Sequence, residues 1–486
     1  MDKFQALKKY FGYDAFRGGQ EKIIDGILQG RDVLAVMPTG AGKSLCYQVP
    51  AMLLPGITLV ISPLIALMKD QVAALEKAGI PAIFLNSSLD SEDFFAALRS
   101  IRSGRSRLVY VSPERLNVPA FVELCRSVRV SLVAVDEAHC ISQWGNDFRP
   151  NYMRIAGFVG QLPERPVVGA FTATATPKVR SDIRQNLRLR SPVEVTLTFD
   201  RPNLYFAVST PQSREGYLRR LIREREGRSG IVYCATRKTV ESVCAMLEDF
   251  GISAGMYHAG LSPEKRSQSQ EDFLSDRVPV MVATNAFGMG IDKPNVSYVI
   301  HYNMPKTIEA YYQEAGRAGR NGEPADCILL YSGRDVHTQK WLIEHSEPNP
   351  ALSEEMKQEV RRLDYERLQR MTAYATGSGC LRQSILNYFG ERSVGACGRC
   401  SNCLRALRER EEAEAKKPLP AVPPPAKKPN TIDASAYVPG AAAVWNGLAV
   451  TIVGRSGDIA ELLLPDGTRR RVSLTVALDR GMIDLR

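Results

Sequence analysis

Residues 33–48 read VLAVMPTGAGKSLCYQ, an apolar run followed by a glycine-rich turn and a helical segment. In a strand–turn–helix of this kind, the N–H groups of the turn and of the helix N-terminus can cradle phosphates. We therefore expect Lys43 to neutralise charge on the β- and γ-phosphates of a nucleotide, and Ser44 to bind Mg²⁺. An ordinary turn between a strand and a helix is the alternative interpretation of this segment alone.

The loop departs from the strict phosphate-binding pattern G-x-x-x-x-G-K-S/T at its first position, where Met37 stands. Gly40 and Gly42 still allow the backbone of this loop to approach and bind phosphates. Together with Thr39, these glycines belong to the predicted nucleotide-binding set.

Short apolar runs alternate with helical patterns on both sides of this loop. The runs of the first group are RDVLAVM (31–37), ITLVIS (57–62), RLVYVS (107–112), SLVAVDE (131–137) and VVGAFT (167–172). The second group consists of GIVYC (230–234), SAGMY (253–257), VPVMVAT (278–284), VSYVIH (296–301) and ADCILLYS (325–332). This alternation predicts an α/β fold with two tandem domains, each built on a buried parallel sheet and joined near residues 199–203.

Two carboxylates end the run VAVDEAH (133–139). At the end of a buried strand beside a phosphate loop, Asp136 can hold Mg²⁺ through water, and Glu137 can act as general base toward the hydrolytic water. A solvated turn is the alternative for an acidic strand end alone.

In their order, these motifs resemble those of superfamily-2 helicases, and specifically of the RecQ family of DNA helicases. The resemblance covers Phe11 to about Cys403 and rests on FGYDAFRGGQ (11–20), MPTGAGKS (37–44), VDEAH (135–139), TATAT (172–176), NAFGMGIDKP (285–294) and QEAGRAGR (313–320). It implies two RecA-like domains, dependence on ATP and Mg²⁺, and 3′ to 5′ translocation on DNA in recombination and repair.

The resemblance also implies how the nucleotide is held. Gln20 hydrogen-bonds the adenine, which Tyr13 and Arg17 sandwich. Gln313, Arg317 and Arg320 come from the second domain, and they reach ATP only when the two domains close. We favour Arg320 as the arginine finger, with Arg317 as its neighbour.

The loop CISQWGNDFRPNY (140–152) resembles the aromatic-rich loop of RecQ proteins. Trp144, Phe148 and Arg149 can stack on or clamp the bases of single-stranded DNA, because stacking tolerates any sequence. The position of the loop directly after Glu137 favours coupling between DNA and hydrolysis. Core packing of Trp144 is the alternative.

Four cysteines follow the pattern C-x16-C-x2-C-x2-C, namely Cys380, Cys397, Cys400 and Cys403. Four thiolates with close pairs suit tetrahedral Zn²⁺, and they leave no open position, so the site should be structural. The other six cysteines are scattered singly within apolar segments, which is typical of reduced core residues. The nearby LRQSILNYFGE (381–391) also resembles the RecQ zinc-binding subdomain, and SEEMKQEVRRLDYERLQRMTAYA (353–375) predicts a capped helix before the cluster.

The expected domains are a first RecA-like domain over 1–200, a second over 201–335 and a helical zinc-binding subdomain over 336–407. A Pro/Lys-rich linker over 408–431 and a small β-rich module over 432–486 follow. Neither the winged helix nor the HRDC domain of many RecQ proteins fits this end of the sequence, so the unwinding strength and the role of the module stay open. A run of three arginines at 469–471 makes an accessory nucleic-acid contact one hypothesis for the module. A solvated face and a protein-docking module are the alternatives.

The 486 residues carry a formal net charge of +10, which fits a polyanion partner without requiring one. The longest apolar stretch, residues 57–68, is too short for a membrane span, and the N-terminus lacks the features of a signal peptide. We therefore expect no membrane association, DNA with single-stranded or forked regions as partner, and an intracellular protein: cytoplasmic and nucleoid-associated in a bacterium, or nuclear in a eukaryote.

Two alternative functions remain. One is an RNA-remodelling DEAH-type ATPase, which FRGGQ and the cysteine cluster disfavour. The other is a nucleic-acid-binding scaffold with weak ATPase activity, which the presence of Lys43, Glu137 and the arginines Arg317 and Arg320 disfavours.

Overall fold

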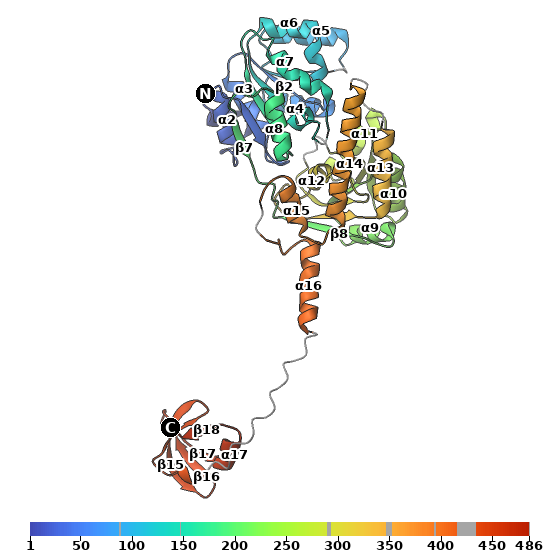
Figure 1. Ribbon diagram of the computed structural model, residues 1–486. Helices are drawn as coiled ribbons and strands as arrows, with labels where there is room; N and C mark the ends of the chain where they lie inside the picture. The colour runs from blue at the N-terminus through green and yellow to red at the C-terminus, as the bar shows by residue number, and fades with distance from the viewer. Residues whose placement is uncertain are drawn as a thin grey trace. The chain divides into compact units, whose positions relative to one another are not determined.

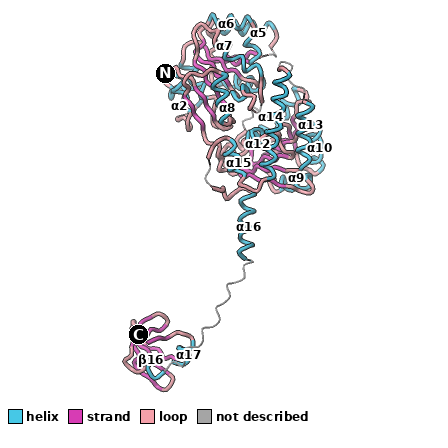
Figure 2. The backbone as a smooth tube through the Cα atoms, in the orientation of Figure 1, coloured by secondary structure: helices cyan, strands magenta, loops and turns pink. Residues whose placement is uncertain are grey.

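The computed structural model describes residues 1–86, 89–145, 147–288, 293–346, 352–392, 395–415 and 434–485. It divides into two compact units, Met1–Glu409 and Arg410–Arg486. The first unit contains two parallel sheets and a helical region with the cysteine cluster, and the second contains an antiparallel sheet (Figure 1 and Figure 2). The α/β fold with its additional regions is therefore confirmed.

The first sheet has seven parallel strands in the order β3-β4-β2-β5-β6-β1-β7. Successive side chains of its strands face opposite sides, and β-branched and aliphatic residues fill both sides of the central strands. The strands are β1 (Val33–Val36), β2 (Ile57–Ile61), β3 (Ala82–Leu85), β4 (Leu108–Val111), β5 (Val130–Val135), β6 (Val167–Thr172) and β7 (Val193–Thr196).

Helices cover both faces of this sheet. Residues of α2, α3 and α4 share one core with Val33 and Ala35 of β1, while residues of α5 to α8 share the other with Leu34 and Val36. The helices are α1 (Lys3–Ala6), α2 (Gln20–Leu28), α3 (Leu45–Leu53), α4 (Ile65–Lys77), α5 (Ser91–Arg102), α6 (Pro119–Ser127), α7 (Ile155–Val159) and α8 (Pro177–Asn186), with shorter helical turns at Leu7–Phe11, Pro113–Asn117, Ala138–Ile141 and Pro150–Arg154.

The second sheet has six parallel strands in the order β10-β11-β9-β12-β13-β8. Its strands are β8 (Leu204–Ser209), β9 (Ser229–Tyr233), β10 (Ala254–Tyr257), β11 (Val280–Ala283), β12 (Val296–His301) and β13 (Ala325–Leu330). The helices around it are α9 (Arg214–Arg223), α10 (Arg237–Asp249), α11 (Pro263–Leu274), α12 (Ile308–Ala315) and α13 (Gly333–His345).

Three observed strands, β3, β7 and β8, are absent from the runs that the sequence pattern singles out. All three lie at sheet edges. Edge strands are less fully buried than central ones, as the alternating exposure of β7 shows, and their apolar pattern is correspondingly weaker.

The cysteine region packs on the connection between the two sheets through α15. Its helices are α14 (Glu354–Thr376), α15 (Leu381–Tyr388) and α16 (Ser401–Ala415). Phe389 stacks on Phe199 of the connection with ring centroids 4.4 Å apart, and Glu391 accepts a 2.7 Å hydrogen bond from the N–H of Phe199. Buried Arg382 donates to the side chain of Asp200. The cysteine region therefore fixes the start of the second domain.

The helix predicted over 353–375 is present as α14, and Ser353 caps it by accepting a hydrogen bond from the N–H of Met356. Helix α16 continues to Ala415, eight residues into the stretch expected to be linker (408–415). Its exposed Glu and Arg residues are good helix formers, so the charge-rich sequence continues the helix. The rest of the expected linker and the first two residues of the expected module lie outside the described residues.

The second unit is a five-stranded antiparallel sheet in the order β17-β16-β15-β14-β18. Its elements are β14 (Ala442–Trp445), β15 (Leu448–Ser456), β16 (Ile459–Leu463), β17 (Arg469–Ser473), α17 (Leu474–Asp479) and β18 (Ile483–Leu485), preceded by a turn at Ala434–Ala436. Residues such as Val450, Ile452 and Leu462 form a core of its own. The β-rich character expected of this region is confirmed.

Among the residues described, no helix combines the length and apolar character needed to cross a bilayer.

Candidate functional site

The glycine-rich loop connects β1 to α3, at the carboxyl end of a central strand. Gly40 and Gly42 have backbone φ angles of +84° and +74°, which residues other than glycine rarely adopt. The Nζ of Lys43 donates a 3.2 Å hydrogen bond to the carbonyl of Met37, so the lysine side chain folds back over its own loop. The position that departs from the strict pattern thus supplies a backbone contact.

Gln20 ties the N-terminal segment to this loop. Its Nε2 donates to the carbonyls of Ala41 and Gly42, each at 3.1 Å, and its Oε1 accepts a 2.8 Å bond from the N–H of Arg17. The guanidinium of Arg17 lies over the ring of Tyr13, 5.8 Å from its centroid. The three residues predicted to recognise adenine are therefore together beside the loop.

A cavity of about 260 Å³ joins these residues to the second domain. Its lining includes eight of the predicted site residues, namely Tyr13, Arg17, Gln20, Gly40, Gly42, Lys43, Ser44 and Arg320. The side chain of Arg320 lies against Gly40, where an added Cβ would be 3.6 Å from the arginine Cγ. Thr39 faces Gly316 of the same second-domain segment, because a Cβ on Gly316 would lie 3.8 Å from the Thr39 hydroxyl.

The acidic pair follows β5 directly. Glu137 has a left-handed backbone with φ +45°, and its N–H donates a 3.0 Å bond to Asp136. Burial raises the pKa of Asp136 to about 7, and the charge of Glu137 adds to this rise. Burial also opposes ionisation of Glu137, but the hydrogen bond and charge of His139, with the charge of Lys43, lower its pKa to about 2. The lowered pKa favours the ionised form of Glu137, which is the form that a general base needs.

A chain of polar contacts runs from Glu137 to the second domain. The Nδ1 of His139 lies 3.3 Å from Glu137 and 3.0 Å from the Thr172 hydroxyl, which in turn donates to the carbonyl of Thr174 at 3.0 Å. The hydroxyl of Thr174 accepts a 2.9 Å hydrogen bond from Gln313 Nε2 on α12. We call these five residues the interdomain relay. Its His139 and threonines lie within recognised motifs, but they were absent from the predicted site set.

Arg317 lies apart from the smaller cavity. It is buried and donates to the carbonyl of Gly288, the last described residue before the gap at 289–292, which falls within the motif NAFGMGIDKP. With Glu137, Arg149 and Gln313, it lines a second cavity of about 680 Å³ between the two domains. Of the two predicted arginines, only Arg320 borders the phosphate loop.

The aromatic loop contributes its three predicted residues in different ways. Trp144 is half-buried against the core, with Lys178 Nζ and Arg362 Cζ at 5.9 and 6.0 Å from its ring centroid. Arg149 donates to Asp147 at 3.0 Å and to the Pro63 carbonyl at 3.1 Å, and Phe148 is half-buried. The packing of Trp144 agrees in part with the core alternative, and the role of these residues stays a prediction.

Helix α14 contacts the aromatic loop through a residue that the sequence did not single out. Buried Arg367 donates to the carbonyl of Gln143 and, at 2.8 Å, to Asp364. Asp364 also accepts a 2.8 Å bond from Lys306 of the second domain. The sequence could not predict this contact, because Arg367 is one of many charged residues in its helix and Gln143 lies 224 positions away.

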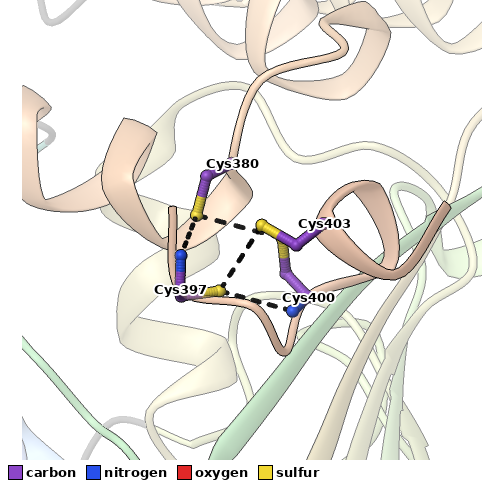
Figure 3. Close-up of side chains that lie close together, drawn as sticks. All are labelled: Cys380, Cys397, Cys400 and Cys403. Carbon is purple, nitrogen blue, oxygen red and sulfur yellow. Dashed lines mark hydrogen bonds between the residues drawn. The ribbon is translucent and has the colours of Figure 1, made fainter. Parts of the chain in front are cut away.

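The four cysteines of the predicted zinc site converge on one point (Figure 3). Their sulfur atoms all lie within 4.8 Å of one another, and the Cys397–Cys403 and Cys380–Cys400 pairs are 3.9 and 4.0 Å apart. A zinc–sulfur distance of about 2.3 Å places neighbouring sulfurs of a tetrahedral site about 3.8 Å apart. The residues present therefore fit Zn²⁺.

Backbone N–H groups surround these sulfur atoms. Cys380 is the N-cap of α15, and its sulfur accepts a hydrogen bond from the N–H of Cys397 at 3.3 Å. The sulfur of Cys397 accepts from the N–H groups of Arg399 and Cys400 at 3.4 and 3.3 Å. Partial burial raises the pKa of the Cys397 thiol, but these two N–H groups help to lower it to about 7. Such donors stabilise the thiolate form that binds a metal.

Three protein families match consecutive parts of the chain. Residues 17–183 match DEAD/DEAH box helicase, residues 213–322 match the helicase conserved C-terminal domain, and residues 333–404 match RecQ zinc-binding. The last match contains all four cysteines, so zinc binding by this region is supported from both geometry and sequence.

Relatives that match about four fifths of the chain show the same similarity. The chain is 45% identical over 393 residues to the ATP-dependent DNA helicase RecQ of Bacillus subtilis, which covers 81% of this chain and 65% of that protein. It is 44% identical to the RecQ of Haemophilus influenzae, over 80% of this chain and 62% of that protein. A helicase of Acanthamoeba polyphaga mimivirus, provisionally named as acting on RNA, is 40% identical over 80% of this chain and 70% of its own length.

Solved structures share the fold at low identity. Mss116p bound to single-stranded RNA and AMP-PNP matches 86% of this chain and 93% of that chain, with a TM-score of 0.59 and 18% identity. The Mycobacterium smegmatis helicase Lhr bound to single-stranded DNA and AMP-PNP covers 77% of this chain and 58% of that chain, with a TM-score of 0.53 and 20% identity.

Proposed function

This chain belongs to the RecQ family of helicases, and we propose that it is an ATP-dependent DNA helicase that translocates 3′ to 5′ on single strands and acts in recombination and repair. The observation that supports this most is the cavity in which the phosphate loop meets Arg320. That cavity draws its lining from both parallel-sheet domains, as ATP-driven domain closure requires. The direction of translocation rests on the family alone.

The residues around the cavity divide the work of hydrolysis. Lys43 neutralises phosphate charge, and Arg320 stabilises the charge that develops on the transferred phosphoryl group. Ionised Glu137 accepts a proton from the attacking water. The hydroxyl of Ser44 and the carboxylate of Asp136, oxygen donors of the kind that Mg²⁺ prefers, would hold the ion, which would neutralise phosphate charge.

The interdomain relay offers a route by which hydrolysis and domain movement are coupled. Glu137 is linked through His139, Thr172 and Thr174 to Gln313, so a shift of α12 relative to the first domain breaks or restores its last hydrogen bond. The aromatic loop follows Glu137 directly. We therefore propose that DNA binding at Trp144, Phe148 and Arg149 changes the contacts of this relay and so the rate of hydrolysis. Zn²⁺ at the four cysteines has a structural role.

The chain spans about three fifths of the length of the bacterial RecQ proteins it matches, at 60–65%. The activity of the whole protein is therefore part of this proposal. An RNA-remodelling ATPase is less favoured, because the zinc-binding match and both bacterial relatives point to RecQ DNA helicases. A scaffold with weak ATPase activity is less favoured, because the sequence contains Lys43, Glu137 and Arg320.

The test is ATP hydrolysis by the full chain, titrated with single-stranded DNA, duplex DNA, forked DNA and single-stranded RNA. We expect the largest stimulation from single-stranded and forked DNA, and unwinding of a duplex with a 3′ overhang. Greater stimulation by RNA would support the RNA-remodelling alternative. Nucleic-acid binding with no stimulation of hydrolysis would support the scaffold.

A further inference from the structure

Trp341 lies on α13, a helix that packs beside α14 (Figure 1). Its side chain is 57% exposed, the largest exposed fraction among the exposed aromatic side chains of the described residues. Keeping an indole ring in water forgoes the stability that its burial would give. Neither the proposed ATP site nor the predicted aromatic-loop set includes this residue.

A neighbouring ring holds Trp341 in place. The imidazole of His345, one helical turn further along, stacks on the indole with centroids 4.5 Å apart and planes 17° from parallel. The Nδ1 of His345 lies 2.9 Å from the Trp341 carbonyl, which fixes the orientation of the imidazole. The two exposed rings therefore form a preformed aromatic surface, which we call the Trp341–His345 platform.

The platform borders the larger cavity, about 680 Å³ in volume. The lining of that cavity also includes Asp147 and Arg149 of the aromatic loop. Two cationic side chains of its lining pair with carboxylates: Lys306 with Asp364 at 2.8 Å, and Arg149 with Asp147 at 3.0 Å. A third, Arg317, is buried and donates to the carbonyl of Gly288. At Trp341 the cavity is bordered by exposed ring faces, which favours contact with a base over contact with a phosphate.

We propose that the Trp341–His345 platform binds an unpaired nucleobase of single-stranded DNA by stacking. Sequence-independent binding of a strand relies on such aromatic faces, because every base has a π-face. The platform would extend the path of the strand from the aromatic loop to the second domain. This inference rests on the proposed function, since it assigns a further contact to the same strand.

The first measurement uses Trp341 as its own probe. The sequence has three tryptophans, so the full chain with Trp144→Phe and Trp445→Phe reports on Trp341 alone. We expect saturable quenching of its fluorescence by a 12-nucleotide oligothymidylate and no quenching by AMP-PNP, whose base belongs in the smaller cavity. Quenching by AMP-PNP alone would overturn the assignment to a strand.

The second measurement compares Trp341→Ala with Trp341→Phe in otherwise wild-type chain. By fluorescence anisotropy, the alanine variant should bind the labelled oligonucleotide on the order of 10-fold more weakly, and the phenylalanine variant should recover most of the affinity. Phe95→Ala is the matched control, because Phe95 on α5 is 52% exposed and lies outside the lining of this cavity. It should bind as the wild type does.

The outcomes separate the inference from the proposed function. If single strands bind and stimulate ATP hydrolysis while Trp341 fluorescence and the alanine variant's affinity are unchanged, the platform is refuted and the helicase proposal stands. If single strands neither bind nor stimulate hydrolysis, both are refuted.

Discussion

The cysteine cluster and the proposed nucleotide cavity, which is the cavity of about 260 Å³ at the glycine-rich loop, are assembled in opposite ways. All four cysteines come from residues 380–403. Cys380 caps α15, Cys403 lies in α16, and nearby backbone N–H groups donate to Cys380, Cys397 and Cys400. The nucleotide cavity takes residues from Tyr13 to Arg320, and it exists only where the second domain meets the phosphate loop. The first site depends on a short segment and a metal, and the second depends on the relation between two domains.

This difference predicts which site each kind of substitution should affect. The cysteine region also holds the connection between the domains, through Phe389 on Phe199 and Arg382 on Asp200. Its loss should therefore disturb the assembled site indirectly, while damage inside the nucleotide cavity should leave the cysteine region intact. The predictions below test this asymmetry, from the largest expected effect to the smallest.

Cys400→Ser should release the metal and unfold the local segment. Apparent zinc-binding free energies are on the order of 10 kcal/mol and are coupled to folding, so the loss of one ligand should be severe. We expect zinc content to fall from one ion per chain and limited proteolysis to cut within 376–407. Cys244→Ala, which removes a buried thiol outside the cluster, should retain the metal. A wild-type chain without zinc would contradict the prediction.

Lys43→Ala should abolish ATP turnover, by about 10³-fold or more, since no other side chain of the loop supplies positive charge to the phosphates. Affinity for single-stranded DNA should change by no more than a few-fold, because it rests on other groups. Zinc content and protease resistance should be those of the wild type. Lys22→Ala, at an exposed position of α2, is the control. Turnover within a few-fold of the wild type would refute the nucleotide assignment.

Arg320→Ala should lower kcat by roughly 10²- to 10³-fold while the affinity for a nucleotide analogue changes little, because the guanidinium acts on charge that develops in the transition state. Steady-state kinetics and analogue binding separate the two effects. Arg223→Ala, at an exposed position of α9 in the same domain, should have neither. An unchanged kcat with weaker analogue binding would count against the finger.

Gln313→Ala removes the second-domain end of the interdomain relay. Coupling contacts of this kind contribute about 0.5–2 kcal/mol, so DNA-stimulated hydrolysis should fall roughly 2- to 30-fold. Hydrolysis without DNA should fall less, because the catalytic groups stay in place. Gln268→Ala on α11 alters an exposed amide outside the relay and should leave both rates unchanged. Equal losses in both rates would indicate a direct role in hydrolysis.

Removal of the C-terminal unit should have the smallest effect. Truncation after Ala415 keeps the described helix α16 (Ser401–Ala415) and removes the five-stranded sheet. We expect single-strand-stimulated hydrolysis to remain and DNA affinity to fall by no more than a few-fold, with a weaker salt dependence. The arginines at 469–471 limit the expected loss, since Arg469 and Arg471 approach Glu461 and Arg470 lies over Trp445. Unchanged binding at every salt concentration would favour a protein partner.

The sequence pattern predicted the strands that are buried on both faces of a sheet. The central strands β1, β2, β5 and β6 read as continuous apolar runs, because helices cover both faces of the sheet. The edge strands β3, β7 and β8 gave no comparable signal, since their burial depends on which neighbours they acquire. The continuation of α16 over residues 408–415 was not predicted, because these exposed, charged residues show no apolar pattern that would indicate a helix.

The sequence by itself determined the chemistry that depends on local spacing. The glycine-rich loop, the acidic pair after β5 and the four cysteines each lie within one short segment of the sequence, so the local backbone largely sets their geometry. The tertiary structure alone decided how Glu137 connects to Gln313. It also decided that Arg367 contacts the aromatic loop and that Trp341 lines the cavity between the domains. Those contacts join residues tens to hundreds of positions apart, and only the packing of complete domains brings such side chains within reach of one another.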